Sequence, residues 1–143
     1  MKISPTGQVK DLLKTVPLFA ACSKREINLL AGIVEVEQFA AGAELCREGE
    51  AGLGLFIVME GETEVKVKGR TRRKLGPGAF FGEIALLDGG PRSATVVAST
   101  DVKSMLIPAW SFNATLKSDP SLAITMLKEV CRRVRTSDSS LST

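Results

Sequence analysis

The sequence predicts an α+β protein in which an antiparallel β-roll, similar to a double-stranded jelly roll, is flanked by N-terminal and C-terminal helices. Apolar residues recur at helical spacing in residues 9–31 and again in residues 109–136. Between these segments, short runs alternate apolar and polar residues and are broken by glycine. About seven or eight strands at a spacing of roughly 8 to 12 residues are typical of a small barrel or jelly roll.

The N-terminal helices are expected in two pieces within residues 9–31. Val9, Leu12 and Leu13 lie on one face of the first piece, and Ile27, Leu30 and Ala31 repeat the same spacing in the second. Ser23 and Glu26 have the spacing of a capping box, in which each side chain accepts from the backbone amide of the other. The second helix is therefore predicted to begin near Lys24.

The roll is predicted over residues 33–108 and the C-terminal helices over residues 109–136. Asp119 followed by Pro120 is typical of an N-cap and a first-turn proline, and predicts a helix break at this point. Trp110 and Phe112 are expected to dock the preceding helix onto the roll. No linker or internal repeat is visible, so residues 1–143 are predicted to form a single domain.

Composition excludes several classes of site. The chain has no histidine, which excludes Ser-His-Asp, Cys-His and His-ligated zinc chemistry. Its three cysteines, Cys22, Cys46 and Cys131, are far apart, so we expect neither a metal knuckle nor a disulfide framework, and they fit a reducing cytoplasm. No apolar run approaches the ~20 residues of a membrane helix. We therefore predict a cytoplasmic protein with no metal site and no membrane span.

Charge gives no support for nucleic-acid binding by this chain alone. The formal net charge is +3, far below the basic excess that contacts with a phosphate backbone require. Residues 70–74 hold four basic side chains. Since they lie where a hairpin is expected, they are interpreted as a solvated loop rather than a nucleic-acid patch.

Residues 80–97 hold the most informative pattern. Gly82 opens a short helical turn over residues 83–87, whose first amides have no partner within the helix and attract an anion. Arg92, at the start of the next strand, can direct a charged fork at the same anion. Glu83 would be repelled by an anion unless the ligand also offers a hydroxyl group, as a ribose does. An anion and a hydroxyl together point to a nucleotide.

This segment resembles the phosphate-binding cassette of cyclic nucleotide-binding domains, F-G-E-[LI]-A-L followed by P-R-x-A-T. The family includes the sensor domain of the bacterial catabolite activator and the regulatory domains of cyclic-nucleotide-dependent kinases. The resemblance covers about residues 12–135 and implies contacts to the cyclic phosphate and to the ribose. Those implied for the phosphate are Arg92, Ser93, Ala94 and Ala85, and those for the ribose 2′-OH are Glu83 and Gly82.

The resemblance also implies an apolar pocket for the base, lined by Cys46, Val65, Leu75, Phe81 and Ile84. Arg133 and Val134, on the last helix, are implied as a lid, with Arg133 approaching Glu83 and Val134 covering the base. Ser93 stands where members that favour cyclic GMP often have threonine, and members that favour cyclic AMP often have alanine. This position therefore favours neither base.

The sequence thus predicts a regulatory module that senses a 3′,5′-cyclic mononucleotide, with cyclic AMP preferred, and whose C-terminal helix closes over the base. Cyclic AMP or cyclic GMP is expected as a ligand, and no cofactor is expected. No catalytic residue is assigned, because a phosphodiesterase would need metal ligands or a general base at the phosphate, and only Glu83 is available there.

Other functions remain open at this point. The chain can be the sensor fragment of a transcription activator, or of a larger enzyme or channel, or a cassette that no longer binds nucleotide. Its output is expected to be an unidentified downstream protein, because after Arg135 only eight residues remain in this sequence. The apolar stripe of Leu122, Met126 and Val130 fits a lid or a homodimer helix equally well.

Overall fold

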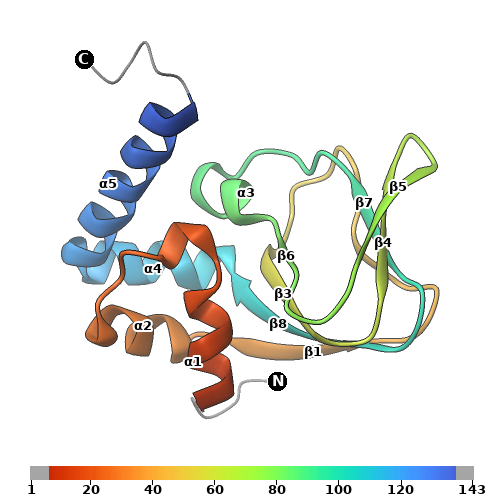
Figure 1. Ribbon diagram of the computed structural model, residues 1–143, viewed down its shortest axis with the longest axis horizontal. Helices are drawn as coiled ribbons and strands as arrows, with labels where there is room; N and C mark the ends of the chain where they lie inside the picture. Colours follow the sequence, from red (N-terminus) through yellow and green to blue (C-terminus); the bar gives the residue numbers. More distant parts are fainter. Residues whose placement is uncertain (1–6, 138–143) are drawn as a thin grey trace. The chain divides into compact units, whose positions relative to one another are not determined.

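A computed structural model describes residues 7–137 of the chain (Figure 1). Within these residues the chain divides into two compact units. The roll unit comprises residues 33–112, and the helical unit combines residues 7–32 with residues 113–137. Each unit is described separately below.

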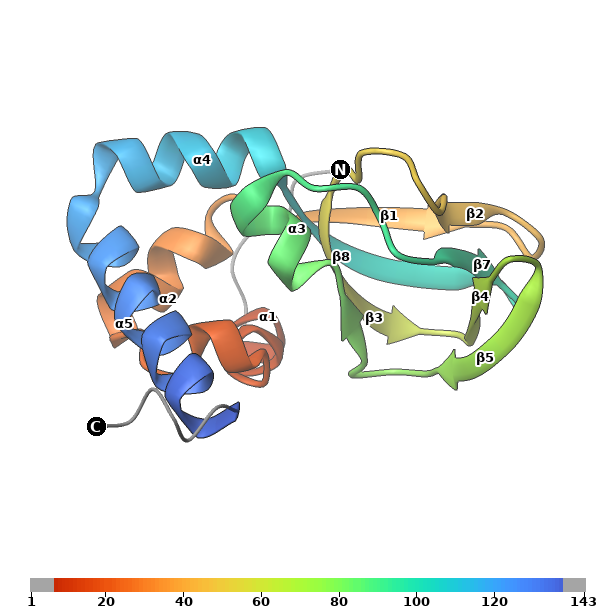
Figure 2. The ribbon, with the colours of Figure 1, turned by 90° about the horizontal axis from the view of Figure 1, so that it is seen from above.

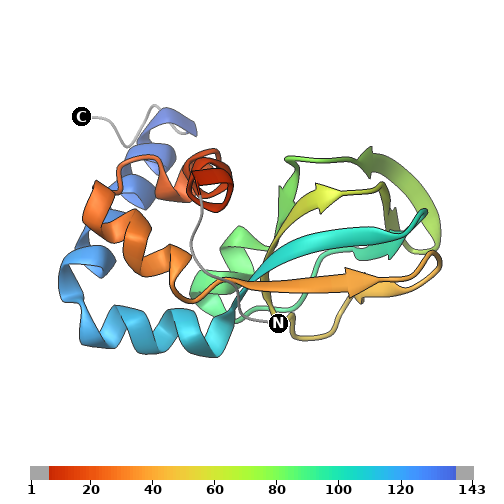
Figure 3. The same cartoon turned by 90° about the horizontal axis from the view of Figure 1, so that it is seen from below.

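The roll unit contains two antiparallel sheets of four strands each, which confirms the predicted α+β fold with an antiparallel roll. The first sheet has the order β1 (Glu35–Phe39), β8 (Val102–Pro108), β3 (Gly54–Glu60) and β6 (Phe80–Phe81). The second has the order β2 (Glu44–Cys46), β7 (Thr95–Ala98), β4 (Thr63–Val67) and β5 (Arg70–Leu75). Figure 3 shows β1, β8 and β3 of the first sheet side by side.

Both sheets contribute their inner faces to one apolar core, as the period-two alternation of the strands requires. Phe56 of β3 is fully buried and stacks on Phe81 of β6, with ring centroids 5.0 Å apart. The Phe39 ring of β1 packs edge to face against the Phe56 ring, with ring centroids 6.0 Å apart. The core cluster consists of Leu45, Phe56, Val58, Val65, Val96, Ala98, Val102 and Leu106.

A short helix, α3 (Glu83–Asp88), connects the two sheets, and α4 (Ala109–Ser118) follows β8. Phe112 is fully buried, as expected, but Trp110 is 74% exposed, so the prediction that Trp110 docks this helix is wrong. Residues two apart on an α-helix lie on nearly opposite faces, and only one of the pair can face the core.

The helical unit contains α1 (Gly7–Lys14), the 3₁₀ turn η1 (Pro17–Phe19), α2 (Lys24–Ala31), the end of α4 and α5 (Pro120–Ser137). The predicted capping box is present at the start of α2: the Glu26 amide donates to Ser23 Oγ at 3.2 Å, and the Ser23 amide donates to Glu26 Oε1 at 2.8 Å. Asp119 accepts from the Leu122 amide at 3.3 Å, which confirms the predicted N-cap of α5. Figure 2 shows the sharp turn between α4 and α5 at this residue.

Polar contacts join α2 to the beginning of α5 within the helical unit. Arg25 donates to Asp119 Oδ2 at 2.6 Å and to Ser121 Oγ at 2.5 Å. Thr125 Oγ1 donates to Glu26 Oε2 at 2.9 Å. The first two turns of α5 are thereby tied to α2.

Apolar burial defines the inner face of α5. Leu122 and Met126, at 0% and 2% exposure, belong to the core of the helical unit. Val130, the third residue of the predicted stripe, is half-buried, so this stripe is available neither to a dimer nor to a lid, the two roles expected for it. The exposed large apolar side chains of this helix are instead Ile124, Leu127 and Val134. Within the described residues, no helix combines the length and the apolar character needed to cross a bilayer.

Candidate functional site

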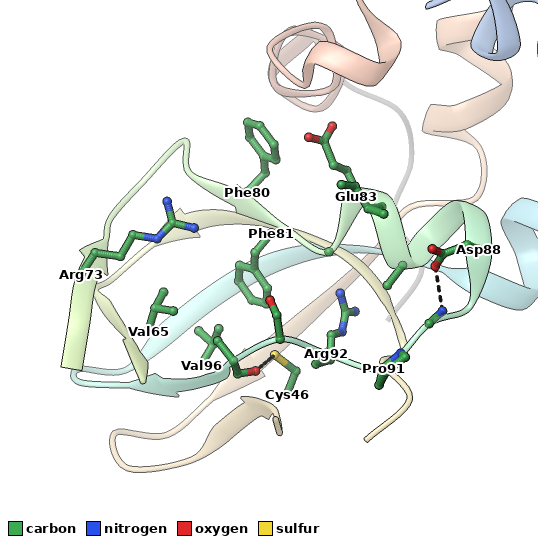
Figure 4. A pocket seen from close by; sticks show the side chains of 16 residues that line it. Cys46, Val65, Arg73, Phe80, Phe81, Glu83, Asp88, Pro91, Arg92 and Val96 are labelled. Carbon is green, nitrogen blue, oxygen red and sulfur yellow. Dashed lines mark hydrogen bonds between the residues drawn. The ribbon is translucent and has the colours of Figure 1, made fainter. Parts of the chain in front are cut away.

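An open cavity of about 500 Å³ lies in the roll unit (Figure 4). Its walls come from β2, β4, β5, β6, α3, β7 and the segment between α3 and β7. Its size is in the range of small-molecule sites. The lining residues are Cys46, Val65, Arg73, Phe80, Phe81, Gly82, Glu83, Ile84, Ala85, Asp88, Gly90, Pro91, Arg92, Ser93, Ala94 and Val96.

Two glycines set the ends of α3 at the wall of this cavity. Gly82 caps the N-terminus with φ +93°, and Gly89 follows the C-terminus with φ +67°. Both values lie in the left-handed region that side chains disfavour. The Leu86 amide donates to Gly82 O, and the Gly89 amide donates to Ala85 O. The helix is thus fixed at both ends, with its first-turn amides at the cavity.

The backbone around Arg92 is held by a loop between β2 and β3. The Arg92 amide donates to Glu50 O at 3.0 Å, and the Gly49 amide donates to Arg92 O at 2.8 Å. An antiparallel bridge between Ala51 and Pro91 continues this pairing. The Arg92 side chain therefore enters the interior from a fixed backbone position.

Arg92 is the one strongly buried basic side chain among the described residues, with 6% exposure. Its Nη2 donates to Gly54 O, but Nε and Nη1 are buried and have no hydrogen-bond partner. None of the ion pairs found in residues 7–137 includes it. Desolvation lowers the pKa of the Arg92 guanidinium. A buried cation without an acidic partner is costly, and an anionic ligand in the cavity would remove that cost.

Glycines also make the space for this guanidinium. A Cβ on Gly52 would overlap Arg92 Nε, and a Cβ on Gly82 would overlap Arg92 Nη1. Gly54, whose carbonyl accepts from Arg92, has no room for a side chain either, because a Cβ there would meet Ile107 O. Two glycines thus leave room for the guanidinium, and the carbonyl of a third accepts a hydrogen bond from it.

Acidic side chains lie on α3 beside this site. Glu83 is half-buried in the first turn, and Figure 4 shows its carboxylate directed away from the Arg92 guanidinium. Asp88, at the other end of α3, accepts from the Gly90 amide at 2.7 Å and shapes the turn before Arg92. Neither carboxylate neutralises Arg92, so the cavity can offer an anion site and a separate hydroxyl acceptor.

The other end of the cavity is mainly apolar. Val65 and Val96 are buried members of the core cluster, and Phe81 continues the aromatic stack described above. The Cys46 thiol donates to Ala94 O at 3.7 Å, and burial raises its pKa, an effect that nearby Arg92 opposes. A flat apolar group fits beside these side chains, and Arg73 borders this end, whereas Arg92 and the acidic residues of α3 lie at the other.

Most residues singled out from the sequence line this one cavity. They are Gly82, Glu83, Ile84, Ala85, Arg92, Ser93, Ala94, Cys46, Val65 and Phe81. Ile84 is 66% exposed and so lies at the rim. Leu75 does not line the cavity, because it packs against the core cluster instead. Arg133 and Val134 belong to α5 of the helical unit.

Sequence reasoning missed several lining residues. Phe80, Asp88, Gly90, Pro91 and Val96 lie next to predicted positions, and strand alternation from Ala94 could have added Val96. Arg73 is expected in a solvated hairpin, but strand alternation from Leu75 and the pairing of β5 with β4 place it at the cavity. No group of three or more cysteine or carboxylate side chains in the described part of the chain could hold a metal ion.

Comparisons with known proteins relate the chain to a known family. The family model for the cyclic nucleotide-binding domain matches residues 36–119. A solved structure of the N-terminal domain of a transcriptional regulator from Streptomyces coelicolor A3(2) superposes with a TM-score of 0.79 at 32% identity, covering 91% of this chain and 94% of that chain.

Two curated relatives come from different classes of protein. A cyclic nucleotide-gated potassium channel of Mesorhizobium japonicum is 37% identical over 123 residues, which cover 86% of this chain and 34% of the channel. A cAMP-dependent protein kinase regulatory subunit of Colletotrichum orbiculare is 35% identical over 96 residues, or 66% of this chain and 25% of that protein. The chain therefore spans about a third or less of the length of these relatives. It belongs to the cyclic nucleotide-binding domain family.

Proposed function

We propose that this chain is a ligand-sensing regulatory module that binds a 3′,5′-cyclic mononucleotide, with cyclic AMP as its main ligand. Membership of the family implies cyclic AMP or cyclic GMP as ligand, rather than a cofactor. The observation that carries the proposal for this chain is the buried Arg92, whose Nε and Nη1 have no partner in the protein. A cyclic phosphate would supply the charge and the acceptors that this side chain lacks.

The remaining contacts follow from the two ends of the cavity. At the phosphate, Ser93 and the amides of Ala85 and Ala94 would join Arg92. Glu83 with Gly82 would accept the ribose 2′-OH, a role supported by a carboxylate that points away from the guanidinium. The apolar end, with Cys46, Val65 and Phe81, and Ile84 at the rim, would hold the base.

Sensing is proposed to involve closure of α5 over the base, with Arg133 approaching Glu83 and Val134 covering the purine. Such a change requires that the nucleotide bind the closed state better than the open one. Val134 is among the exposed apolar side chains of α5, which suits a residue that becomes covered on closure. Hydrogen exchange should then slow in residues 80–97 and in the second half of α5 when cyclic AMP is added. Slower exchange confined to residues 80–97 would contradict closure.

Binding itself is tested by isothermal titration calorimetry with cyclic AMP and with 5′-AMP. Micromolar or tighter binding of cyclic AMP, at least about 10-fold tighter than 5′-AMP, is expected, because a singly charged cyclic ester fits one guanidinium in a restricted site. No heat with cyclic AMP, in protein shown to be folded and free of bound nucleotide, would contradict the proposal and leave the cavity as a remnant of a lost site.

Homodimerisation through α5 is a second proposal, on a different face from the one expected. Ile124, Leu127 and Cys131 follow one another at intervals of three and four residues, and the two large apolar ones are exposed. This is the spacing of a two-helix seam. Light scattering should show a concentration-dependent dimer that Leu127→Glu abolishes. A monomer at all concentrations would exclude this use of the face.

The output of the chain and its cellular location are also predictions. The relatives include a channel and a kinase regulatory subunit, and the structural neighbour belongs to a transcriptional regulator. We propose that the present chain binds a ligand and thereby acts on a downstream protein, without catalysis. We propose also that it makes no contact of its own with a membrane or a nucleic acid. Residues 1–143 would form a single domain. The cytoplasmic location expected from its three cysteines is part of the same prediction.

A further inference from the structure

The hairpin of β4 and β5 concentrates positive charge at one edge of the roll unit. Residues 66–74 contain six basic and no acidic side chains, so the other 134 residues carry 13 basic against 16 acidic ones. One of the six, Arg73, lines the cavity. We refer to the five that do not line it as the basic edge: Lys66, Lys68, Arg70, Arg72 and Lys74.

The protein supplies little negative charge to the basic edge. All of its side chains except that of Lys66 are exposed. None of the ion pairs found in the described part of the chain includes one of them. Glu64 lies opposite Lys74, and Glu48 Oε1 accepts from the Lys68 backbone amide at 2.9 Å. Since like charges repel one another, the basic edge would attract an acidic partner.

The turn of the hairpin carries a charge where the backbone disfavours a side chain. Lys68 and Gly69 form the tip, with φ of +51° and +78°. Two positive φ values are typical of a type I′ turn, which favours asparagine or glycine at its first position. Lys68 is the one non-glycine residue with a left-handed φ in the described part of the chain. A hairpin with a structural role alone would have no use for a lysine at this position.

β5 is also the outermost strand of the second sheet, with β4 as its neighbour (Figure 1). An edge strand presents backbone N–H and C=O groups that are not paired within the sheet. The six residues Arg70–Leu75 span about 20 Å, which is enough to pair with a short extended segment. An added strand would place its side chains next to those of the basic edge.

The charge of the remaining molecule separates the possible acidic partners. A nucleic acid or a membrane is an extended anion that would also face the rest of the chain, whose formal net charge without residues 66–74 is −3. A short acidic segment of a protein would contact the basic edge alone. A peptide also offers N–H donors and C=O acceptors to an edge strand, whereas a phosphate group offers acceptors only. These properties favour an extended acidic peptide.

We propose that β5 binds an acidic segment of the downstream protein in extended conformation, as an added strand of the second sheet. The inference rests on the proposed function, because it gives the chemistry of the protein on which the module acts. A structural interpretation assigns the same charges to protection of the edge against aggregation. That interpretation predicts no affinity for an acidic peptide that can form a strand.

The test is calorimetry of wild type with two synthetic peptides of about eight residues at low salt. The first peptide alternates Glu with Val and Thr, and the second alternates Glu with Pro, which removes every second N–H donor. The first should bind with a Kd of about 100 µM or tighter, and at least about 5-fold more tightly than the second. Equal binding of the two peptides would overturn strand addition, and no binding of the first would overturn the site.

A double variant places the contact on the basic edge. Arg70→Gln with Arg72→Gln removes two exposed charges and should weaken the first peptide by about 5- to 10-fold. The matched control is Lys14→Gln with Lys117→Gln, which removes the same charge from exposed positions of the helical unit. This control should stay within about 2-fold of wild type. Equal weakening in the two variants would reduce the interaction to net charge and overturn the site.

Hydrogen exchange and two other anions test the kind of partner. The first peptide should slow exchange in β5 but not in β1, the edge strand of the first sheet. Unchanged exchange in β5 would overturn strand addition. A short DNA duplex, or vesicles that contain phosphatidylserine, should bind more weakly than the peptide. Tighter binding of either one through Arg70 and Arg72 would overturn the choice of a peptide.

Cyclic AMP affinity separates this inference from the function on which it rests. Arg70 and Arg72 do not line the cavity, so their double variant should keep the affinity for cyclic AMP within about 2-fold. Wild type that binds cyclic AMP but not the first peptide would overturn the inference alone. Wild type that binds the peptide but neither cyclic nucleotide would contradict the proposed function and leave the peptide site in place.

Discussion

Arg92 of the roll unit and Arg25 of the helical unit satisfy their charges in opposite ways. Arg25 is exposed, pairs with Asp119 and also donates to Ser121. Arg92 is buried, donates to one carbonyl and leaves two nitrogens unpaired. An acidic side chain of the protein neutralises the charge of Arg25, whereas no acidic side chain among the described residues pairs with Arg92. Since uncompensated buried charge opposes folding, the second arrangement indicates a ligand site rather than a structural contact.

The largest effect is expected on ligand binding from Arg92→Glu. It replaces the cation at the proposed phosphate site with an anion, and should weaken cyclic AMP by at least about 100-fold. Arg47→Glu is the control, because Arg47 is exposed and pairs only with Glu44 and Glu50 on the surface. Calorimetry should show an affinity within about 2-fold of wild type for this control. Equal affinity in wild type and Arg92→Glu would remove Arg92 from the site.

A smaller loss is expected from Gly82→Ala, because the added Cβ would displace the Arg92 guanidinium without removing it. Gly42→Ala is the matched control: Gly42 has nearly the same φ, +92° against +93°, but open space around it. The two variants share the backbone strain of about 1 kcal/mol or more. Cyclic AMP affinity should fall by about 10-fold or more only in Gly82→Ala. Similar losses in both would mean that strain, and not the position of Arg92, controls binding.

Glu83→Gln should weaken cyclic AMP by about 3- to 10-fold, less than the loss of Arg92, because it weakens one hydrogen bond to a neutral hydroxyl. The comparison ligand is 2′-deoxy cyclic AMP, which lacks that hydroxyl. Its affinity should be the same for wild type and Glu83→Gln. A drop of equal size for both ligands would show that Glu83 acts on the position of α3 and not on the ribose.

The smallest effect concerns Arg25, whose pair contributes to the stability of the fold. Arg25 and Ser121 lower the pKa of Asp119 in the folded protein. The ionised carboxylate therefore stabilises the fold above its unfolded pKa of about 3.9, and this contribution is lost as pH falls through the lower folded value. Arg25→Ala should lower Tm slightly at pH 7, as exposed pairs do, and the difference from wild type should shrink below about pH 3. A constant difference in Tm across this range would exclude the ion pair as its cause.

The predictions from the sequence agree best with the structure where a feature depends only on the local backbone conformation. The capping box at Ser23, the proline start of α5 and the glycine-bounded turn at Gly82 all act within a few residues, so their patterns are visible in the sequence. The end of the cavity that we propose for the phosphate belongs to this class. Its residues lie in one short segment, 80–97, which is why the sequence could predict them.

Positions that depend on strand register were harder to predict. The pairing of β5 with β4 places Arg73 opposite Val65, and the bulge at Arg72 shifts the register of the strand only beyond that pair. Gly52 is distant from Arg92 in the sequence, yet its lack of a side chain leaves room for the Arg92 guanidinium. Trp110 and Phe112 are equally apolar in the sequence, and only the direction of α4 decides which of them is buried. Such features require the three-dimensional pairing of distant segments.

The central claim is that Arg92 serves the ligand and not the fold, and thermal unfolding of Arg92→Met tests it most directly. Methionine fills a similar space without a charge. Without nucleotide, the variant should unfold at the same temperature as wild type or at a higher one, and added cyclic AMP should raise Tm only in wild type. A fall in Tm of more than about 5 °C in the ligand-free variant would mean that Arg92 is a structural residue, and would contradict the claim.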